Sequence, residues 1–480
     1  MSSDRHSIHA ARGVEEHRES DAYLQKRQLK RGTAGWVLLA SLGVGYVISG
    51  DYSGWNFGLA QGGFGGLVIA AVVIAGMYLA LVLGMAELSS ALPAAGGGYT
   101  FARRALGPWG GFATGTAILI EYAIAPAAIA TFIGAYVESL NLFGIQDGWW
   151  IYLVVYAVFI GIHLSGVGEA LKVMFAITGI ALVGLAIFAI AAIGRFEPSN
   201  LTDIAVDDGA VGASAFLPFG VLGIWAAIPF AIWFFLAIEG VPLAAEEAAN
   251  PERNVPRGII AAMAVLLITC TTVLILTTGA GGAAEMSDSG NPLVEALGGS
   301  AMAKVVNYIG LAGLIASFFS IIYAYSRQLF ALSRAGYLPT VLSVTNSRKA
   351  PTLALVVPGI IGFLLSLTGR GALLLNMAVF GAALSYVLMM VSHIVLRRRE
   401  PDMPRPYRTP GGVFTTGFAL LVAILAVIAT FLVDSLAALW CLIVFAAFMA
   451  YFGLYSRHRL VANSPDEEFA ALAAAEDDLR

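Results

Sequence analysis

Three carboxylates interrupt stretches of sequence that are otherwise apolar enough to lie in lipid. Asp51 follows a Ser-Gly pair, Glu239 precedes a glycine, and Glu121 stands in the run AILIEYAIAPAAIA, shortly before a proline. A charged side chain at the depth of the bilayer centre is expensive and usually functional. We therefore take these three carboxylates as candidates for binding a cation or for moving protons.

Two of the carboxylates lie where a membrane helix is expected to break. Residues 49–51 interrupt the first apolar stretch, and residues 238–240 interrupt a later one. Irregular backbone within a membrane is tolerated only where protein buries it or where it lines a cavity. A broken helix offers carbonyl groups that attract cations and N–H groups that attract anions. Ser49, Gly50 and Ile238 are therefore predicted to contribute backbone groups to a binding site.

Each carboxylate also has a purely structural interpretation. Asp51 either attracts the cation of a substrate or caps the second half of the first helix, where the helix dipole favours an anion. Glu239 either couples protonation to gating or ties its break to the first span by hydrogen bonds. Glu121 either faces the cavity as a second amine or proton site, or is a satisfied polar residue between helices.

Trp233 belongs to an aromatic run that directly precedes the second break. An ammonium group over an aromatic face gains about 0.5–2 kcal/mol. Helical spacing lets only one or two members of the run face a site, and we favour Trp233. The alternative for such a run is packing against lipid or against other helices.

The whole chain has the composition of an integral helical membrane protein. Of its 480 residues 59% are hydrophobic and 12% are charged, against about 25% charged residues in soluble domains. Its two cysteines fall inside apolar stretches, which leaves no disulfide framework and no metal-ligand spacing. The apolar stretches predict twelve membrane spans: 33–59, 67–92, 109–137, 149–164, 169–193, 222–245, 258–279, 303–332, 352–368, 372–396, 412–433 and 435–455.

The distribution of positive charge supports this division. If the N-terminus is cytosolic, 24 of the 27 Lys and Arg residues fall on the cytosolic side, and only Arg195, Lys304 and Arg370 fall outside. Such an excess is what the positive-inside rule requires. We predict both termini in the cytosol, with tails at 1–32 and 456–480.

The two predicted breaks lie in the first and sixth spans. Interrupted helices at matching positions of two halves are a pointer to the central site of a transporter. Because the offset of five spans is odd, the halves are expected to be inverted. The prediction is an all-α fold of five plus five spans, 33–193 against 222–396, with 412–455 added.

Four motifs in order resemble the amino acid–polyamine–organocation superfamily of transporters. They are the Ser-Gly break of the first span, Glu87…Pro93…Gly97-Gly98-Tyr99, Glu239…Asn250-Pro251-Glu252-Arg253, and Arg327…Gly336-Tyr337-Leu338-Pro339. Within that superfamily, SGDYSGWN and FFLAIEGVPLAAEEAANPERNVPRG look like the ethanolamine permease branch. The resemblance implies a leucine-transporter-like inverted repeat and secondary transport of small amines or amino acids.

The resemblance also assigns expected roles to single residues. Trp233 matches an aromatic position that gates the substrate, and Ser317 lies near an ion or substrate position of related folds. Relatives that carry amino acids have a small or apolar residue where this chain has Asp51. An aspartate about 4 Å from a substrate carboxylate would oppose it by roughly 4 kcal/mol at an effective dielectric near 20. An amine without a carboxylate is therefore expected.

These inferences together predict a secondary active transporter that imports ethanolamine or a similar small primary amine by proton symport with alternating access, with Na⁺ as the alternative coupling ion. The expected substrate site comprises Asp51, Ser49, Gly50, Glu239, Trp233, Ile238, Glu121 and Ser317, with Glu239, Trp233 and Glu121 in gating or coupling. No metal, cofactor or nucleic acid is expected, and the chain is expected in the cell membrane as a monomer or homodimer. A general amino-acid or polyamine permease is the main alternative, and a channel is a distant one. An enzyme is disfavoured because no nucleophile–base pair or metal cluster is visible.

Overall fold

The computed structural model describes residues 7–10, 14–17, 32, 34–93, 96–140 and 149–461. Most of both predicted tails therefore lies outside the described residues. The elements in chain order are β1 (Ser7–Ala10), β2 (Val14–His17), α2 (Trp36–Val47), α3 (Ser49–Tyr52), α4 (Phe57–Ala91), α5 (Gly98–Ser139), α6 (Trp149–Leu164), α7 (Val167–Ile193), η2 (Pro198–Thr202), α8 (Gly220–Trp233), η3 (Ile238–Glu247), α9 (Pro251–Gly281), α10 (Ala283–Met286), α11 (Pro292–Glu295), α12 (Ala301–Arg334), η4 (Thr340–Ser343), α13 (Thr352–Ser366), α14 (Gly371–Arg399), α15 (Val413–Val433), α16 (Ser435–Leu454), η5 (Ser456–His458) and β3 (Leu460–Val461).

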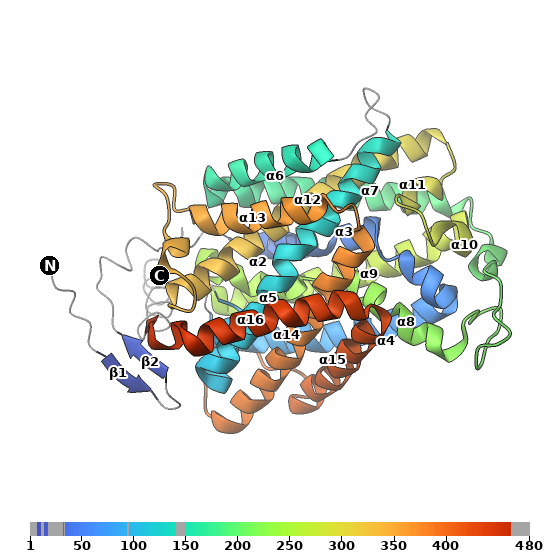
Figure 1. The fold of residues 1–480 in the computed structure, drawn as a ribbon. Helices are drawn as coiled ribbons and strands as arrows, with labels where there is room; N and C mark the ends of the chain where they lie inside the picture. The colour runs from blue at the N-terminus through green and yellow to red at the C-terminus, as the bar shows by residue number, and fades with distance from the viewer. Residues whose placement is uncertain are drawn as a thin grey trace.

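The long helices run side by side along one direction, with β1 and β2 beyond one end and α10 and α11 at the other (Figure 1). In the described part of the chain, nine helical segments are long and apolar enough to cross a membrane. Helix α5 is the most enclosed of them, since 89% of an apolar 18-residue stretch of this helix is buried. It therefore forms the centre of the bundle.

Three shorter apolar helices, α2, α6 and α13, lie where the sequence predicts the first, fourth and ninth spans. The prediction of a helical membrane protein is confirmed. The count of twelve crossings and the inverted symmetry stay predictions.

Two predicted loops are helical kinks instead. The stretch between the first two spans is continuous helix in α4, which bends at Gly63, where φ is +66°. The helix of the third span begins at Gly98 rather than at residue 109, and it bends at Gly107, where φ is +77°. Glycine adopts this left-handed backbone without the steric strain of other residues, so the chain changes direction without a loop.

The break in the sixth span lies earlier than predicted. Helix α8 ends at Trp233, and the chain turns through residues 234–237 before it resumes as the 3-10 helix η3. Ala237 has a left-handed backbone with φ of +75°. The turn lets Phe234 stack on Trp55, with 5.4 Å between the ring centroids, and it brings the ring centroids of Phe235 and Tyr78 to 5.3 Å. Aromatic packing thus shifts the break one turn ahead of Glu239.

A small three-stranded sheet accompanies the helical bundle outside the predicted spans. Strand β1 pairs antiparallel with β2, from Ser7 opposite His17 to Ala10 opposite Val14. Strand β2 pairs in parallel with β3, with Glu16 opposite Leu460. This small sheet joins a segment before the first span to the chain after the last one.

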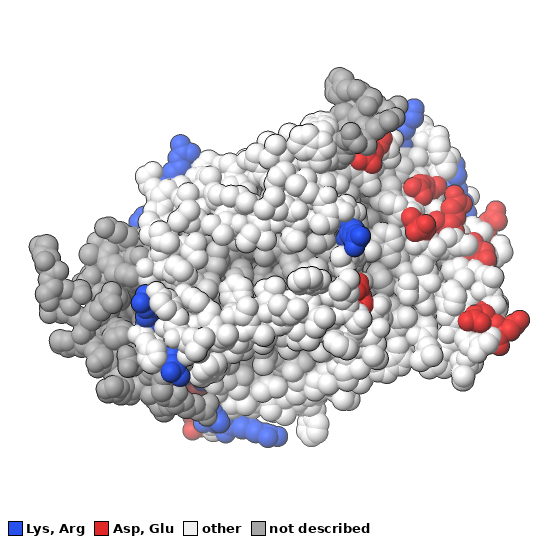
Figure 2. Space-filling view, viewed as in Figure 1, with Lys and Arg blue, Asp and Glu red and all other residues white. Residues whose placement is uncertain are grey.

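The surface between the two ends is nearly free of charge. Figure 2 shows a broad white belt, with acidic side chains gathered at the end that carries α10 and α11. Large apolar side chains such as Leu222, Ile268 and Ile190 are more than two-thirds exposed. A belt of exposed apolar side chains is what contact with lipid requires. The exposed acidic residues at that end include Asp203, Asp207, Asp208, Glu285 and Asp288.

A buried carboxylate, Glu87, holds α4 to the segment between α14 and α15. Its two oxygens accept hydrogen bonds from Arg397 at 2.8 and 2.5 Å, and Arg405 lies 3.1 Å away. The backbone N–H of Thr409 donates to the same carboxylate at 2.7 Å. Because Glu87 is fully buried, loss of its charge would leave several donors without a matching acceptor.

We expect Glu87→Gln to destabilise the purified protein by about 3 kcal/mol, since breaking a buried ion pair leaves an uncompensated charge. Thermal unfolding in detergent measures the loss. Glu400→Gln is the matched control, because Glu400 pairs with Arg104 at 2.9 Å on the surface, where the two side chains are 30% and 58% exposed. An exposed pair contributes about 0–1 kcal/mol. Equal losses in the two variants would contradict this account.

Candidate functional site

The two helix breaks touch each other in the centre of the bundle. A Cβ atom at Gly50 would lie 2.5 Å from the carbonyl oxygen of Trp233 and 3.2 Å from Cα of Phe234. The indole N–H of Trp233, at the second break, donates to the carbonyl oxygen of Ser53, just after the first break, at 2.9 Å. Backbone groups that the first break releases are therefore satisfied by the second break, as the apolar surroundings demand.

The four residues of α3 point toward different neighbours, because successive residues of a helix are about 100° apart. Ser49 faces α12, where its hydroxyl donates to Ser317 Oγ at 2.8 Å. Gly50 faces the second break. Tyr52 faces α7, where its hydroxyl donates to the carbonyl oxygen of Ala181 at 2.7 Å. The predicted site residues Ser49, Gly50, Trp233 and Ser317 thus lie together.

Ser317 pins the first break to α12. Its hydroxyl accepts from Ser49 and donates to the carbonyl oxygen of Tyr46 at 2.6 Å. Tyr46 is in the last turn of α2, so one serine bridges both sides of the break. Serine hydroxyls in membrane helices often bond back to their own helix, as Ser320 does to the carbonyl oxygen of Ala316 at 2.7 Å, but Ser317 instead reaches the first break.

The side chain of Asp51 points away from the groups that Ser49 and Gly50 contact. It is buried, and its carboxylate faces Thr269 and Cys270 of α9. Among the described residues neither of its oxygens accepts a hydrogen bond of ordinary geometry, and the hydroxyl of Thr269 donates to the carbonyl oxygen of Leu266 instead. The side chain of Asp51 makes no capping hydrogen bond to α3. It is a buried carboxyl group that makes no ion pair with a described residue.

Glu239 is held by tyrosines from three other helices. Tyr122 of α5 donates to Oε1 at 2.7 Å, and Tyr386 of α14 donates to Oε2 at 3.2 Å. Tyr78 of α4 donates in turn to the hydroxyl of Tyr386 at 2.9 Å. Glu239 therefore accepts hydrogen bonds on both oxygens and joins the second break to the bundle around it.

Glu121 lies beside Glu239, next to Tyr122 in sequence. It is completely buried, and neither oxygen makes a hydrogen bond of ordinary geometry with another described residue. Two neighbouring carboxyl groups in a low-dielectric site repel each other when both are ionised. A proton or a cation beside the pair removes that repulsion.

The space between the breaks is closed in this conformation. Tyr46, Val47, Ser49, Trp233, Leu236 and Ile321 surround a gap that has no room for a water molecule. Ile238 is buried just beyond it, and its backbone N–H donates to the carbonyl oxygen of Phe235 at 3.4 Å. A ligand at this point requires the two breaks to separate.

One end of the bundle is closed by buried ion pairs. Arg327 of α12 donates from Nε and Nη2 to Glu247 Oε1 at 3.0 and 2.8 Å, and Arg334 donates to Glu246 Oε1 at 2.6 Å. The guanidinium of Arg327 also lies 4.4 Å from the ring centroid of Tyr323. These pairs hold η3 against the last turns of α12.

Neutral hydrogen bonds close the opposite end. The side-chain amide of Asn56, just before α4, donates to the carbonyl oxygens of Met286 and Ser289, both at 2.8 Å. The hydroxyl of Tyr136 donates to the carbonyl oxygen of Tyr52 at 2.9 Å. No ion pair is recorded at these contacts between described residues.

Sequence reasoning missed the tyrosines around Glu239 and the partners of the two arginines. Tyr122 directly follows Glu121, which was a signal of a shared site. Tyr78 and Tyr386 carried no local signal, because nothing in the sequence around them indicates that they lie close to Glu239 in the folded protein. Arg327 appeared only as part of a motif. In the described chain, no group of His, Cys, Asp and Glu could hold a metal ion.

We expect Gly50→Ala to abolish uptake in reconstituted vesicles while leaving the protein folded, because the added methyl group would strike the backbone of Trp233. Gly161→Ala on α6 is the matched control, since a Cβ at that position meets nothing within 4 Å. Circular dichroism checks that both variants remain helical. Normal uptake by Gly50→Ala would disprove the close contact of the two breaks.

Comparison with known proteins points to one family. The family described as amino acid permease matches residues 35–455, which includes both breaks and all eight predicted site residues. An uncharacterized transporter of Rhizobium meliloti is 29% identical over 86% of this chain and 90% of its own length. The branched-chain amino acid permease of Bacillus subtilis is 28% identical, over 84% and 89%. The methylthioribose transporter of the same organism is 29% identical, over 78% and 82%.

Proposed function

The chain belongs to the amino acid permease family, and from that premise we propose that it is a secondary active transporter of small primary amines, with ethanolamine as the first candidate. The observation that carries the proposal is the charge of the bundle interior. Asp51, Glu121 and Glu239 are buried there. The buried arginines of the described helices are paired elsewhere, Arg327 with Glu247 and Arg334 with Glu246.

Because the buried Arg327 and Arg334 are already paired with Glu247 and Glu246, the region around the breaks attracts a cation and opposes a carboxylate. The ends of α2 and α8 add to this potential, because both helices finish at the breaks and present the negative ends of their dipoles there. The indole ring of Trp233 lies at the same point and offers a face to an ammonium group. A primary amine satisfies all of these groups with one charge.

The backbone N–H groups near the breaks are already engaged. The backbone N–H groups of four residues donate to backbone carbonyl oxygens: Asp51 to Ile48, Ser53 to Ser49, Ile238 to Phe235 and Gly240 to Ala237. A substrate carboxylate that binds to these groups would have to displace those hydrogen bonds. This supports an amine without a carboxylate over an amino acid.

Asp51 contributes to recognition through its field rather than by contact in the closed conformation, since it faces α9. Its position differs from the direct contact that sequence reasoning favours. The pair of Glu121 and Glu239 lies nearer to the second break and is the better candidate for direct contact with the ammonium group.

The same pair is a candidate for coupling transport to protons. When the ammonium group leaves, the two neighbouring carboxyl groups need another positive charge, and a proton supplies it. Glu239 is held by two tyrosine hydroxyls, whereas Glu121 has none. We therefore assign the transferred proton to Glu121 and a positioning role to Glu239. Sodium remains the alternative coupling ion.

The runner-up is a general amino-acid permease, which the similarity to the branched-chain amino acid permease of Bacillus subtilis supports. We expect purified protein to bind ethanolamine and not alanine or choline, because alanine adds a carboxylate and choline adds three methyl groups to a closely packed site. Calorimetry measures the affinities. Alanine binding as tight as ethanolamine binding would overturn the amine assignment in favour of the runner-up.

Replacing each carboxylate in turn distinguishes long-range electrostatic attraction of the substrate from direct contact with it. We expect Asp51→Asn to weaken ethanolamine binding several-fold, and Glu121→Gln to weaken it by tenfold or more. Serine hydroxyls remain in place in both variants. Similar effects of the two substitutions would contradict the assignment of direct contact to Glu121.

Proton coupling predicts how uptake responds to pH. Wild-type vesicles should accumulate ethanolamine faster when the outside is more acidic, and Glu121→Gln should exchange ethanolamine across the membrane without this response. Glu138→Gln is the control, because Glu138 is an exposed carboxylate at the end of the same helix. A pH response that survives in Glu121→Gln would place the coupling elsewhere.

A further inference from the structure

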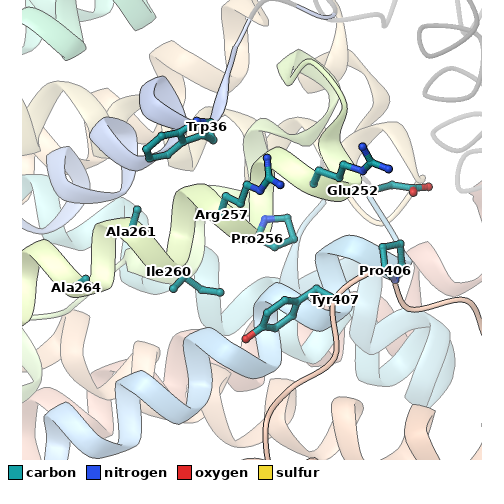
Figure 3. A pocket seen from close by; sticks show the side chains of 10 residues that line it. Trp36, Glu252, Pro256, Arg257, Ile260, Ala261, Ala264, Pro406 and Tyr407 are labelled. Atoms are coloured by element: carbon teal, nitrogen blue, oxygen red, sulfur yellow. The ribbon is translucent and has the colours of Figure 1, made fainter. Parts of the chain in front are cut away.

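A pocket of about 940 Å³ opens on the outside of the bundle, where α2 begins and α9 begins. Helix α9 forms its floor, with Trp36 on one side and Pro406 and Tyr407 on the other (Figure 3). The pocket is separate from the closed gap between the breaks and shares no lining residue with it. The transport proposal does not use it.

Two arginines give the pocket a positive mouth. Arg253 and Arg257 lie one helical turn apart on α9, line the pocket and are exposed. Neither guanidinium group makes a salt bridge or hydrogen bond with a described residue, in contrast to those of Arg327, Arg334 and Arg397. Glu252 lines the same pocket, which leaves a net charge of +1.

Below the arginines the floor becomes apolar. Ile260, Ala261 and Ala264 continue along the same face of α9, as the spacing of three and four residues requires. From Arg253 to Ala264 the helix rises about 16 Å at 1.5 Å per residue. This is about half of the 30 Å hydrocarbon core, the depth of one leaflet. The two alanines leave the floor low enough to hold a chain.

The walls are aromatic at the level of the arginines. Trp36 is 45% exposed at the start of α2, and Tyr407 is held in place because its N–H donates to Ser90 Oγ at 3.2 Å. Tryptophan and tyrosine prefer the boundary between water and hydrocarbon. The mouth of the pocket therefore lies at headgroup depth, on the side where Arg327, Arg334 and Arg397 also lie.

We propose that this pocket binds an anionic phospholipid, with the phosphate between Arg253 and Arg257 and one acyl chain along Ile260, Ala261 and Ala264. A positive mouth above an apolar groove one leaflet deep matches a lipid with a negative headgroup. A soluble phosphate would leave the groove unused, and a neutral lipid would leave the arginines without a partner.

The position of the pocket links lipid binding to the two breaks. Trp36 begins the helix that ends at the first break, and α9 follows directly after η3. A lipid that touches both walls binds best when the walls are at their present separation. It therefore stabilises the conformation described here, as any ligand does that prefers one state.

Native mass spectrometry and thermal shift on the purified full-length protein test the proposal, with phosphatidylglycerol compared with phosphatidylcholine. We expect phosphatidylglycerol to bind more tightly and to raise the melting temperature. Arg253→Gln with Arg257→Gln should weaken its binding about fivefold for each arginine removed. Lys172→Gln with Arg398→Gln removes the same charge from exposed positions outside the pocket and should leave binding unchanged.

The groove is tested separately from the charge. Ala264→Phe should fill it and reduce binding of phosphatidylglycerol, whereas Ala186→Phe, at an exposed alanine of α7, should not. Binding that survives both the double arginine substitution and Ala264→Phe would overturn the proposal. So would equal stabilisation by inorganic phosphate, which would identify a site for a soluble anion. All of these readouts are independent of transport.

Discussion

The structure depends on satisfying the polar backbone of two broken helices inside an apolar bundle. An unpaired N–H or carbonyl group in hydrocarbon costs several kcal/mol, so neither break could persist alone. Each is satisfied by the other or by a neighbouring helix, through the indole of Trp233, the hydroxyl of Ser317 and the close approach at Gly50. The groups that complete the backbone are therefore the groups that a substrate must displace.

This dependence explains why the sequence is informative about some parts and silent about others. Apolar length predicts the membrane helices, and glycine beside a carboxylate predicts irregular backbone near residues 49–51. Glycine also misleads, because Gly63 and Gly107 make kinks within helices rather than loops between them. The second break lies ahead of Gly240, where Phe234 packs on Trp55 and Phe235 packs on Tyr78, and no local pattern in the sequence reports these partners.

Side-chain direction is the other quantity that sequence alone did not supply. Ser49, Gly50 and Asp51 are adjacent in sequence, yet they face α12, the second break and α9. A prediction that treats them as one cluster is misleading, because a single helical turn directs the three residues toward three different neighbours. Conversely, the tyrosines around Glu239 come from three helices and meet only in the folded bundle.

The two ends of the bundle are closed by different kinds of contact, so separating the two ends requires different amounts of work. Opening the end with η3 separates buried ion pairs of Glu247 with Arg327 and of Glu246 with Arg334, and this requires rehydration of four charges. Among the described residues, the contacts of Asn56 at the other end are neutral hydrogen bonds, which contribute about 1 kcal/mol each. Entry of water therefore changes the energy of the end with η3 more than that of the end with Asn56.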